Sequence, residues 1–193
     1  MIRALLLLLA ALLPLPAIAQ DDVRVALDTT AGRIVVAVHA DKAPITAANF
    51  LAYVDGKRLD GTNFYRGVGA ADYGFVQGGA QNDPKRLLPP IKHEPTTLTG
   101  LTHDDGALSM ARYAPGSATA DFFIVLGKMP GMDAHPEAAG DNQGFAVFAH
   151  VVEGLDAVKA ILTAPKSATA GEGVMKGQML ETPVKILTAR RVP

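Results

Sequence analysis

The choice of side chains for covalent chemistry is narrow in this sequence, and the chain contains no cysteine. That absence excludes disulfides, thiolate metal sites and cysteine nucleophiles. Ser109 lies in Gly-Ala-Leu-Ser-Met-Ala, which lacks the G-x-S-x-G turn of hydrolases, and no His and Asp pair is spaced convincingly around it. His103, followed by two aspartates, and His135, near Glu137 and Asp141, could collect a divalent cation, but no H-E-x-x-H spacing supports a metal site. A serine hydrolase and a metal enzyme are therefore the less favoured hypotheses.

Two polar side chains stand out by their neighbours instead. Arg66 ends the tripeptide Phe-Tyr-Arg, and a guanidinium is always charged and offers several donors in a rigid fork. Gln77 precedes two glycines, which let another backbone approach closely. Local sequence leaves open that Arg66 only stacks on Tyr65 or pairs with an acid, and that Gln77 is an amide in a turn at a strand end.

Length and charge limit the class of protein. The 193 residues suit one domain. The 18 basic and 19 acidic residues give a formal net charge of −1, and a nucleic-acid-binding protein would show a basic surplus. We therefore expect no nucleic-acid partner.

The first nineteen residues resemble a secretory signal peptide. Arg3 precedes ten apolar residues, Ala4–Leu13, and Ala17-Ile18-Ala19 supplies the small residues of an A-x-A cleavage site. The alternative, a membrane anchor, is disfavoured because a span needs about 20 apolar residues. We predict a signal peptide over 1–19, cleavage near Ala19-Gln20, a single domain over 20–193 without a membrane span, and a periplasmic or otherwise secreted location.

The remaining chain is mainly β. Val23–Thr29 and Arg33–His39 predict an opening hairpin, and Val184–Ala189 predicts a closing strand that could pair with it. Apolar residues at helical spacing predict two helices, Pro44–Val54 and Leu155–Leu162. Short apolar segments predict further strands at Asn63–Arg66, Phe75–Gln77, Ala107–Ala111, Phe122–Leu126 and Ala146–His150. This pattern favours a β-barrel or a sandwich, and pairing of the first and last strands favours the barrel. The residues from Thr163 to Gln178 predict a mobile loop.

Five motifs in order resemble one family. They are Phe64-Tyr65-Arg66, Gln77-Gly78-Gly79, Gly106 to Arg112 (GALSMAR), Asp121-Phe122-Phe123-Ile124 and Phe148 to Gly154 (FAHVVEG). Together with the opening hairpin and first helix, this order and spacing resembles the cyclophilin-type peptidyl-prolyl cis-trans isomerases over nearly the whole chain after residue 19. The resemblance implies a closed eight-stranded antiparallel β-barrel capped by two α-helices.

The resemblance also implies an activity and a site. It implies acceleration of rotation about Xaa-Pro peptide bonds, on proline-containing segments of unfolded or exported proteins, by a monomer that needs no cofactor and no metal. The implied catalytic residues are Arg66, which would polarise the prolyl nitrogen, and Gln77, which would hold the substrate carbonyl. The implied substrate-binding residues are Phe75, Ala111, Arg112, Phe123, Met132 and Phe145. Phe122 and Phe123 are adjacent on a strand, so we expect Phe122 in the core and Phe123 in the groove.

The sequence departs from the family pattern at several positions. This chain has Gly74 where the family usually has an aromatic residue and Gly131 near the position of a family tryptophan. It has Phe145 in place of a histidine, Arg112 in place of an asparagine and Asp121 in place of a glutamine. The stretches 67–73 and 133–144 contain more residues than is usual in the family. We expect Gly74 to remove part of the pocket wall. These departures predict a remodelled groove, and they keep open an alternative: a peptide-binding or chaperone module of the same fold with little or no isomerase activity.

Overall fold

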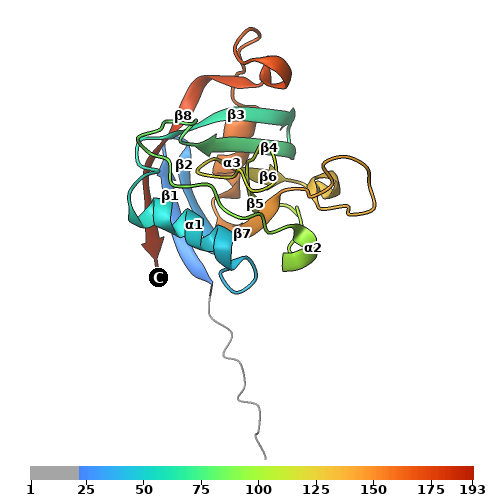
Figure 1. Ribbon diagram of the computed structural model, residues 1–193. Helices are drawn as coiled ribbons and strands as arrows, with labels where there is room; N and C mark the ends of the chain where they lie inside the picture. The colour runs from blue at the N-terminus through green and yellow to red at the C-terminus, as the bar shows by residue number, and fades with distance from the viewer. Residues whose placement is uncertain (1–21) are drawn as a thin grey trace, which may run out of the picture.

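The computed structural model describes residues 22–193, and its main feature is an antiparallel sheet that closes on itself (Figure 1). The strands follow one another round the barrel in the order β1-β2-β7-β5-β6-β4-β3-β8. Their bounds are β1 Val23–Thr29, β2 Gly32–Val38, β3 Asn63–Ala70, β4 Tyr73–Gly79, β5 Ala107–Met110, β6 Phe122–Leu126, β7 Ala146–Glu153 and β8 Met179–Val192. The predicted eight-stranded barrel is confirmed, whereas the predicted signal peptide lies outside the described residues.

The seam of the barrel joins the two ends of the chain. β1 pairs with β2 through an antiparallel register that sets Val25 opposite Val36, and it pairs on its other side with β8, where Val25 lies opposite Arg191. The opening hairpin and its pairing with the closing strand are thus confirmed. β8 begins at Met179, earlier than predicted. The sequence did not indicate this start because Glu181 and Pro183 break the apolar alternation by which a strand is recognised.

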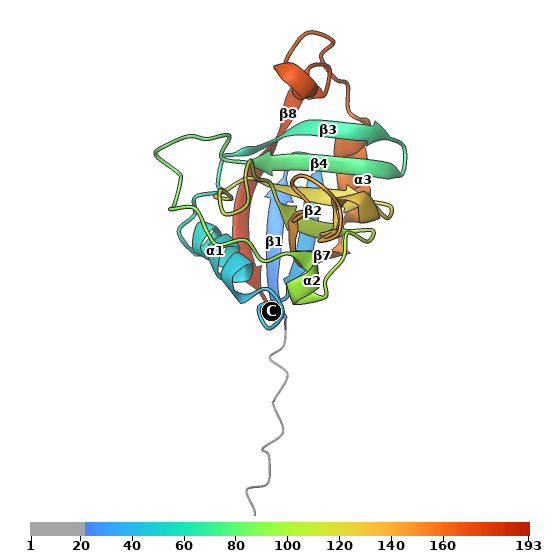
Figure 2. The ribbon, with the colours of Figure 1, turned by 45° about the vertical axis from the view of Figure 1, so that its right-hand side comes forward.

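Two helices cap the barrel from opposite sides (Figure 2). They are α1, Pro44–Asp55, and α3, Leu155–Thr163, within one residue of the predicted bounds. The N-terminus of α1 has no capping side chain of its own; the buried carboxylate of Glu94 instead accepts the backbone N–H groups of Ile45 and Thr46 at 3.2 and 2.7 Å.

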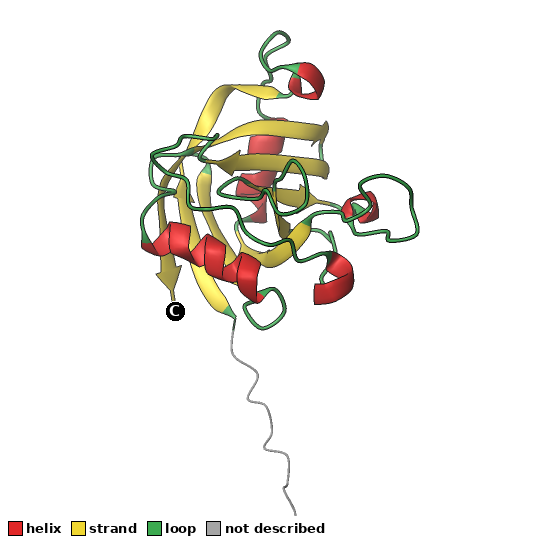
Figure 3. Ribbon diagram, in the orientation of Figure 1, coloured by secondary structure: helices red, strands yellow, loops and turns green. Residues whose placement is uncertain are grey.

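Short helical turns interrupt the loops between the strands (Figure 3). They are α2, Thr96–Thr99, and two single 3₁₀ turns, η1 at Pro130–Met132 and η2 at Gly173–Met175. Three or four residues are too few to show a helical period, so the sequence did not predict them. The segment from Ala164 to Gln178 is a loop, as predicted, and η2 lies near its end; its mobility stays a prediction.

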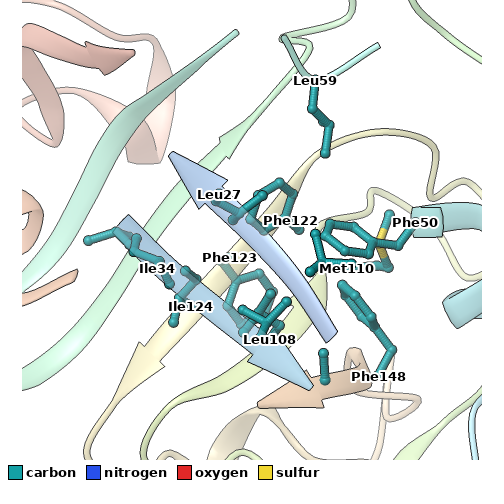
Figure 4. Packing of buried hydrophobic residues seen from close by; sticks show 14 of the residues in the cluster. Leu27, Ile34, Phe50, Leu59, Leu108, Met110, Phe122, Phe123, Ile124 and Phe148 are labelled. Atoms are coloured by element: carbon teal, nitrogen blue, oxygen red, sulfur yellow. The ribbon is translucent and has the colours of Figure 1, made fainter. Parts of the chain in front are cut away.

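The barrel interior is filled by aliphatic and aromatic side chains from every side of the sheet (Figure 4). Phe50 of α1 packs against Phe122 and Phe148, with ring centroids 5.7 and 5.0 Å apart. Phe122 is fully buried in this core, whereas its neighbour Phe123, 4% exposed, packs on the core and also lines a groove on the surface. The predicted division of these two phenylalanines is confirmed, as is expected for successive residues on a strand.

The long β3–β4 hairpin corrects one expectation. The extra residues 67–73 extend both strands, with Ala70 opposite Tyr73. Gly74 does not line the groove: it lies opposite Gly69, with φ +145°, and a Cβ there would come within 2.0 Å of the Val68 carbonyl oxygen. Close approach of the two strands therefore requires glycine at 74, independently of the groove. Within residues 22–193, no helix is long and apolar enough to cross a membrane.

Candidate active site

All eight predicted site residues line one groove on the barrel wall, with a volume of about 430 Å³. A volume of this size suits a small ligand or one residue of a peptide. The predicted residues are Arg66, Phe75, Gln77, Ala111, Arg112, Phe123, Met132 and Phe145. Residues 66, 75, 77 and 123 lie on the adjacent strands β3, β4 and β6, and the other four lie just after β5 or in the loop between β6 and β7.

Aromatic rings form the apolar part of the groove. The Phe123 ring lies 5.4 Å from both Phe75 and Phe145, at interplanar angles of 55° and 90°. Met132 lies beside them, and its carbonyl accepts the backbone N–H of Phe145 at 3.0 Å, which closes the loop between these two residues. Phe145, where the family usually has histidine, thus preserves an apolar wall. A saturated ring of prolyl size could bury apolar surface against these side chains.

The Arg66 guanidinium lies at the edge of this apolar wall. Its Cζ atom is 5.3 Å from the centroid of the Phe75 ring, and its Nη1 donates to Gln77 Oε1 at 2.9 Å. No acidic side chain in residues 22–193 forms an ion pair with it. Partial burial lowers the pKa of Arg66, but a guanidinium stays charged at any physiological pH. The groove therefore contains a positive charge that no carboxylate neutralises.

Sequence reasoning missed a second partner of Arg66. Gln178 Oε1 accepts hydrogen bonds from both Nε, at 2.9 Å, and Nη2, at 2.6 Å, of the guanidinium. The Gln178 carbonyl accepts the N–H of Gly67 at 3.0 Å, which fixes this loop residue beside β3. A contact between residues 112 positions apart leaves no signal in local sequence. Met179, Met175 and the exposed Val174 extend the groove from this same segment.

Arg112 has a different role from Arg66 although its residue type is the same. Its side chain, 4% exposed, forms a bidentate ion pair with Asp141 at 2.6 and 3.0 Å and also donates to the carbonyl oxygens of Tyr113 and Gly144. Its charge is therefore neutralised, and it ties the 133–144 loop to the groove while its Cζ lies 5.1 Å from the Phe145 ring. β5 ends at Met110, one residue before its predicted end, and the Ala111 N–H donates to the Asp121 carbonyl at 2.9 Å.

The geometry around Ser109 corrects one statement made from sequence. His103 Nε2 lies 3.0 Å from Ser109 Oγ, and His103 Nδ1 lies 2.6 Å from Asp133 Oδ1, so a His and Asp pair does surround this serine. Ser109 and His103 are 0% and 1% exposed, however, and the imidazole is stacked against the inner face of Phe123 at 5.9 Å. Burial lowers the pKa of His103, against the opposing effect of Asp133. No substrate carbonyl can reach this hydroxyl, so the three residues support the groove from beneath.

Two of the residues considered as metal ligands have other partners. Asp141 pairs with Arg112, and His135 Nε2 lies 3.0 Å from the Pro130 carbonyl oxygen. Between residues 22 and 193, no three His, Asp or Glu side chains converge in a way that could hold a metal ion.

Comparison with known proteins assigns the chain to a family. Residues 24–191 match the family model described as cyclophilin type peptidyl-prolyl cis-trans isomerase. A peptidyl-prolyl cis-trans isomerase of Streptomyces antibioticus is 41% identical over 140 residues, which cover 71% of this chain and 81% of the relative. Another, of Acinetobacter baylyi, is 33% identical over 193 residues, 98% of this chain and 96% of the relative.

Solved structures agree in fold. A cyclophilin-type peptidyl-prolyl cis-trans isomerase of Cryptosporidium parvum superposes with a TM-score of 0.69 at 18% identity, covering 89% of this chain and 98% of that one. A second structure of that protein, determined in the presence of the dipeptide Ala-Pro, superposes with a TM-score of 0.68. The family match over almost all described residues and the similarity to named isomerases together show that this chain belongs to the cyclophilin-type peptidyl-prolyl cis-trans isomerases and catalyses rotation about prolyl peptide bonds.

Proposed function

We propose that Arg66 donates a hydrogen bond to the prolyl nitrogen of the substrate, that Gln77 holds the substrate carbonyl, and that the apolar wall grips the proline ring. Rotation about an Xaa-Pro bond is slow because resonance gives the C–N bond double-bond character, with a barrier of about 18–20 kcal/mol. A donor that draws the nitrogen lone pair away from the carbonyl weakens that resonance. The reaction breaks no bond to carbon, so it needs neither a nucleophile nor a metal.

The observation that carries this proposal is the unpaired charge of Arg66 next to the aromatic wall. Both acceptors that orient the guanidinium, Gln77 and Gln178, are neutral amides, so they fix its direction without cancelling its charge. The electrostatic attraction therefore acts on the pyramidal nitrogen that forms only in the twisted state. Interactions that are stronger in the transition state than in the ground state are those that raise the rate.

The substrates we propose are proline-containing segments of unfolded proteins that have crossed the inner membrane. Support comes from the signal-peptide pattern of residues 1–19 and from the relative solved in the presence of Ala-Pro. We also propose that the protein acts as a monomer, because its barrel closes through the β1–β8 seam and leaves no unpaired barrel edge for a second copy. N-terminal sequencing of protein from a periplasmic fraction tests the location: the proposal requires Gln20 as the first residue. Light scattering on the same sample tests the monomer.

The catalytic assignment is tested by replacing Arg66. In Arg66→Ala we expect kcat/KM on an Xaa-Pro peptide to fall by about 10² or more, since the loss of such electrostatic stabilisation removes roughly 3 kcal/mol. Arg24→Ala, on the exposed face of β1, is the matched control and keeps the wild-type rate. An unchanged rate in folded Arg66→Ala would show that the assignment is wrong. If the wild-type protein binds the peptide but does not accelerate its isomerisation, the alternative of a peptide-binding module is favoured instead.

A further inference from the structure

Four side chains that line the groove form a continuous line of hydrogen bonds from a guanidinium to a carboxylate. Arg66 Nη1 donates to Gln77 Oε1 at 2.9 Å, Gln77 Nε2 donates to the Tyr65 hydroxyl at 2.7 Å, and that hydroxyl donates to Asp121 Oδ2 at 2.8 Å. Every donor in this relay points the same way, from the cation toward the anion. The family resemblance accounts for Arg66 and Gln77 but assigns no function to Tyr65 or Asp121.

The backbone explains how two adjacent residues of one strand join the same relay. Successive side chains of a regular strand point to opposite faces. In the β3–β4 ladder, however, Phe64 lies opposite Gly78 and Arg66 lies opposite Gln77, so Tyr65 is the extra residue of a β-bulge. The bulge turns both Tyr65 and Arg66 toward Gln77. Gly79 makes room for the carboxylate, since a Cβ there, at φ +133°, would lie 2.3 Å from Asp121 Oδ1.

The relay determines which end of the Gln77 amide faces Arg66. An ionised carboxylate can only accept, so the Tyr65 proton must point to Asp121, and the hydroxyl can then only accept from Gln77. The Gln77 NH₂ group is thereby turned to Tyr65 and its oxygen to the guanidinium. One of the two N–H bonds of that NH₂ group remains available for a substrate carbonyl. In the flipped amide, NH₂ would face the guanidinium donors and this order would be lost.

We propose that Tyr65 and Asp121 are positioning residues that hold the Gln77 amide in its productive orientation. The proposal rests on the roles assigned above to Arg66 and Gln77. Tyr65 is 6% exposed, and Asp121 is further held by the backbone N–H groups of Ala80 and Gln81, the latter at 3.0 Å, so the end of the relay is rigid. No cation in the described part of the chain pairs with Asp121, whose charge is therefore directed to the Tyr65 hydroxyl.

Protonation of Asp121 would release the relay. Burial raises the pKa of Asp121 above its ordinary value, against the hydrogen bonds from Tyr65, Gln81 and Ala80. The titratable groups that face this carboxylate are Tyr65 from β3 and Tyr53 from α1; burial raises the pKa of each, so both hydroxyls remain neutral. Arg66 faces Tyr65 and stays charged. A protonated Asp121 can donate to the Tyr65 hydroxyl, which then no longer forces the Gln77 amide into one orientation.

The test compares Tyr65→Phe and Asp121→Asn with the wild type between pH 4.5 and 8, by NMR exchange spectroscopy on a prolyl peptide. In each variant we expect kcat/KM at pH 7 to fall about three- to tenfold, the size of effect of one lost orienting hydrogen bond. We expect kcat/KM of the double variant to be no lower than that of the less active single variant, because both changes interrupt the same relay. The wild-type rate should fall toward acid pH with a midpoint above the ordinary carboxyl value of about 3.9, and this acid limb should be absent in both variants.

Matched controls keep the result interpretable. Tyr73→Phe, at the exposed end of the hairpin, and the exposed Asp41→Asn should behave as the wild type at every pH. Circular dichroism and urea unfolding establish that each variant is folded; should Asp121→Asn fail to fold, Tyr65→Phe alone decides. A folded Tyr65→Phe with wild-type activity and an unchanged acid limb overturns the positioning proposal. If Arg66→Ala is inactive in the same assay, the proposed function survives that failure; if Arg66→Ala is active, the proposed function itself fails.

Discussion

The contact between Gln178 and Arg66 gives the sharpest test of how the guanidinium is used. In Gln178→Ala, Nε and Nη2 lose their shared acceptor, while Nη1 keeps Gln77. Water can replace the lost amide oxygen at this half-buried site, so the main loss is orientation. Immobilising one long side chain accounts for about 0.5–1.5 kcal/mol. At about 1.4 kcal/mol per factor of ten, kcat/KM should fall by about two- to twelvefold.

The isosteric change Gln178→Glu separates orientation from charge. A carboxylate would hold the Arg66 fork as well as the amide does, but it would also cancel the positive charge that acts on the prolyl nitrogen. Two unit charges about 4 Å apart interact by about 4 kcal/mol at an effective dielectric constant of 20. Half of this energy is already more than the roughly 0.5–1.5 kcal/mol attributed above to the lost orientation of Arg66. The activity should therefore decrease in the order wild type, Gln178→Ala, Gln178→Glu. Stability to urea should show no such order, because the new ion pair helps the folded state.

The assay is the protease-coupled isomerisation of an Xaa-Pro peptide, with urea unfolding of each variant measured in parallel. Lys176→Ala, an exposed residue of the same loop, is the control for effects on the loop as a whole and should leave both quantities unchanged. A Gln178→Glu protein as active as the wild type would refute the reasoning, because it would show that the net charge of Arg66 does not matter. Equal activity of Gln178→Ala and the wild type would show that Gln77 alone orients the guanidinium.

Two further predictions concern stability. At Gly154, φ is +86° and a Cβ would lie 2.0 Å from a backbone carbonyl oxygen, whereas at Gly100, φ is +70° with open space around it. Gly100→Ala should therefore lower the free energy of unfolding only by the cost of a left-handed backbone conformation, about 1–2 kcal/mol. Gly154→Ala should lower it by distinctly more, measured by urea unfolding, and equal losses in the two variants would contradict the clash. The second prediction concerns Asp60, whose pKa is lowered chiefly by the hydrogen bonds from Arg190 at 2.7 and 2.8 Å. A lowered carboxyl pKa stabilises the fold above the unfolded value of about 3.9, and this contribution is lost as pH falls through the folded value. Because Arg190 is 40% exposed, Asp60→Asn should cost no more than about 1 kcal/mol at pH 7, and the difference should shrink as pH falls below the unfolded carboxyl value of about 3.9; a pH-independent difference would count against the ion pair.

The parts of the fold predicted from sequence are those whose signal is local. The α1 helix shows its period in Phe50, Leu51 and Val54, and Pro44 marks its first turn. The cap of that helix left no such signal, because Glu94 lies almost fifty residues away. The bulge at Tyr65 was equally hidden, since a strand pattern gives the alternation of side chains but not the residue at which pairing slips.

The candidate site divides in the same way. Its eight residues were named from the positions that the family resemblance implies, and the structure brings all eight to one groove. Their partners were not predictable. Gln178 reaches Arg66 from a loop without secondary-structure pattern, and Asp121 was visible only as a departure from a usual glutamine. Gly74, a second departure, belongs to the packing of two strands and not to the groove. A residue that departs from a motif thus needs its contacts before it can be given a meaning.

The two arginines of the groove show why contacts decide a role that residue type cannot. Both are partly or fully withdrawn from solvent, and each has its guanidinium near an aromatic ring, at 5.3 Å from Phe75 for Arg66 and 5.1 Å from Phe145 for Arg112. Arg112 is saturated by Asp141 and by carbonyl oxygens, so a substrate would gain little from it. Arg66 is oriented by two amides that leave its charge intact. Of these two arginines, Arg66 is therefore the one we propose as the donor to a prolyl nitrogen, which becomes basic only as its bond twists.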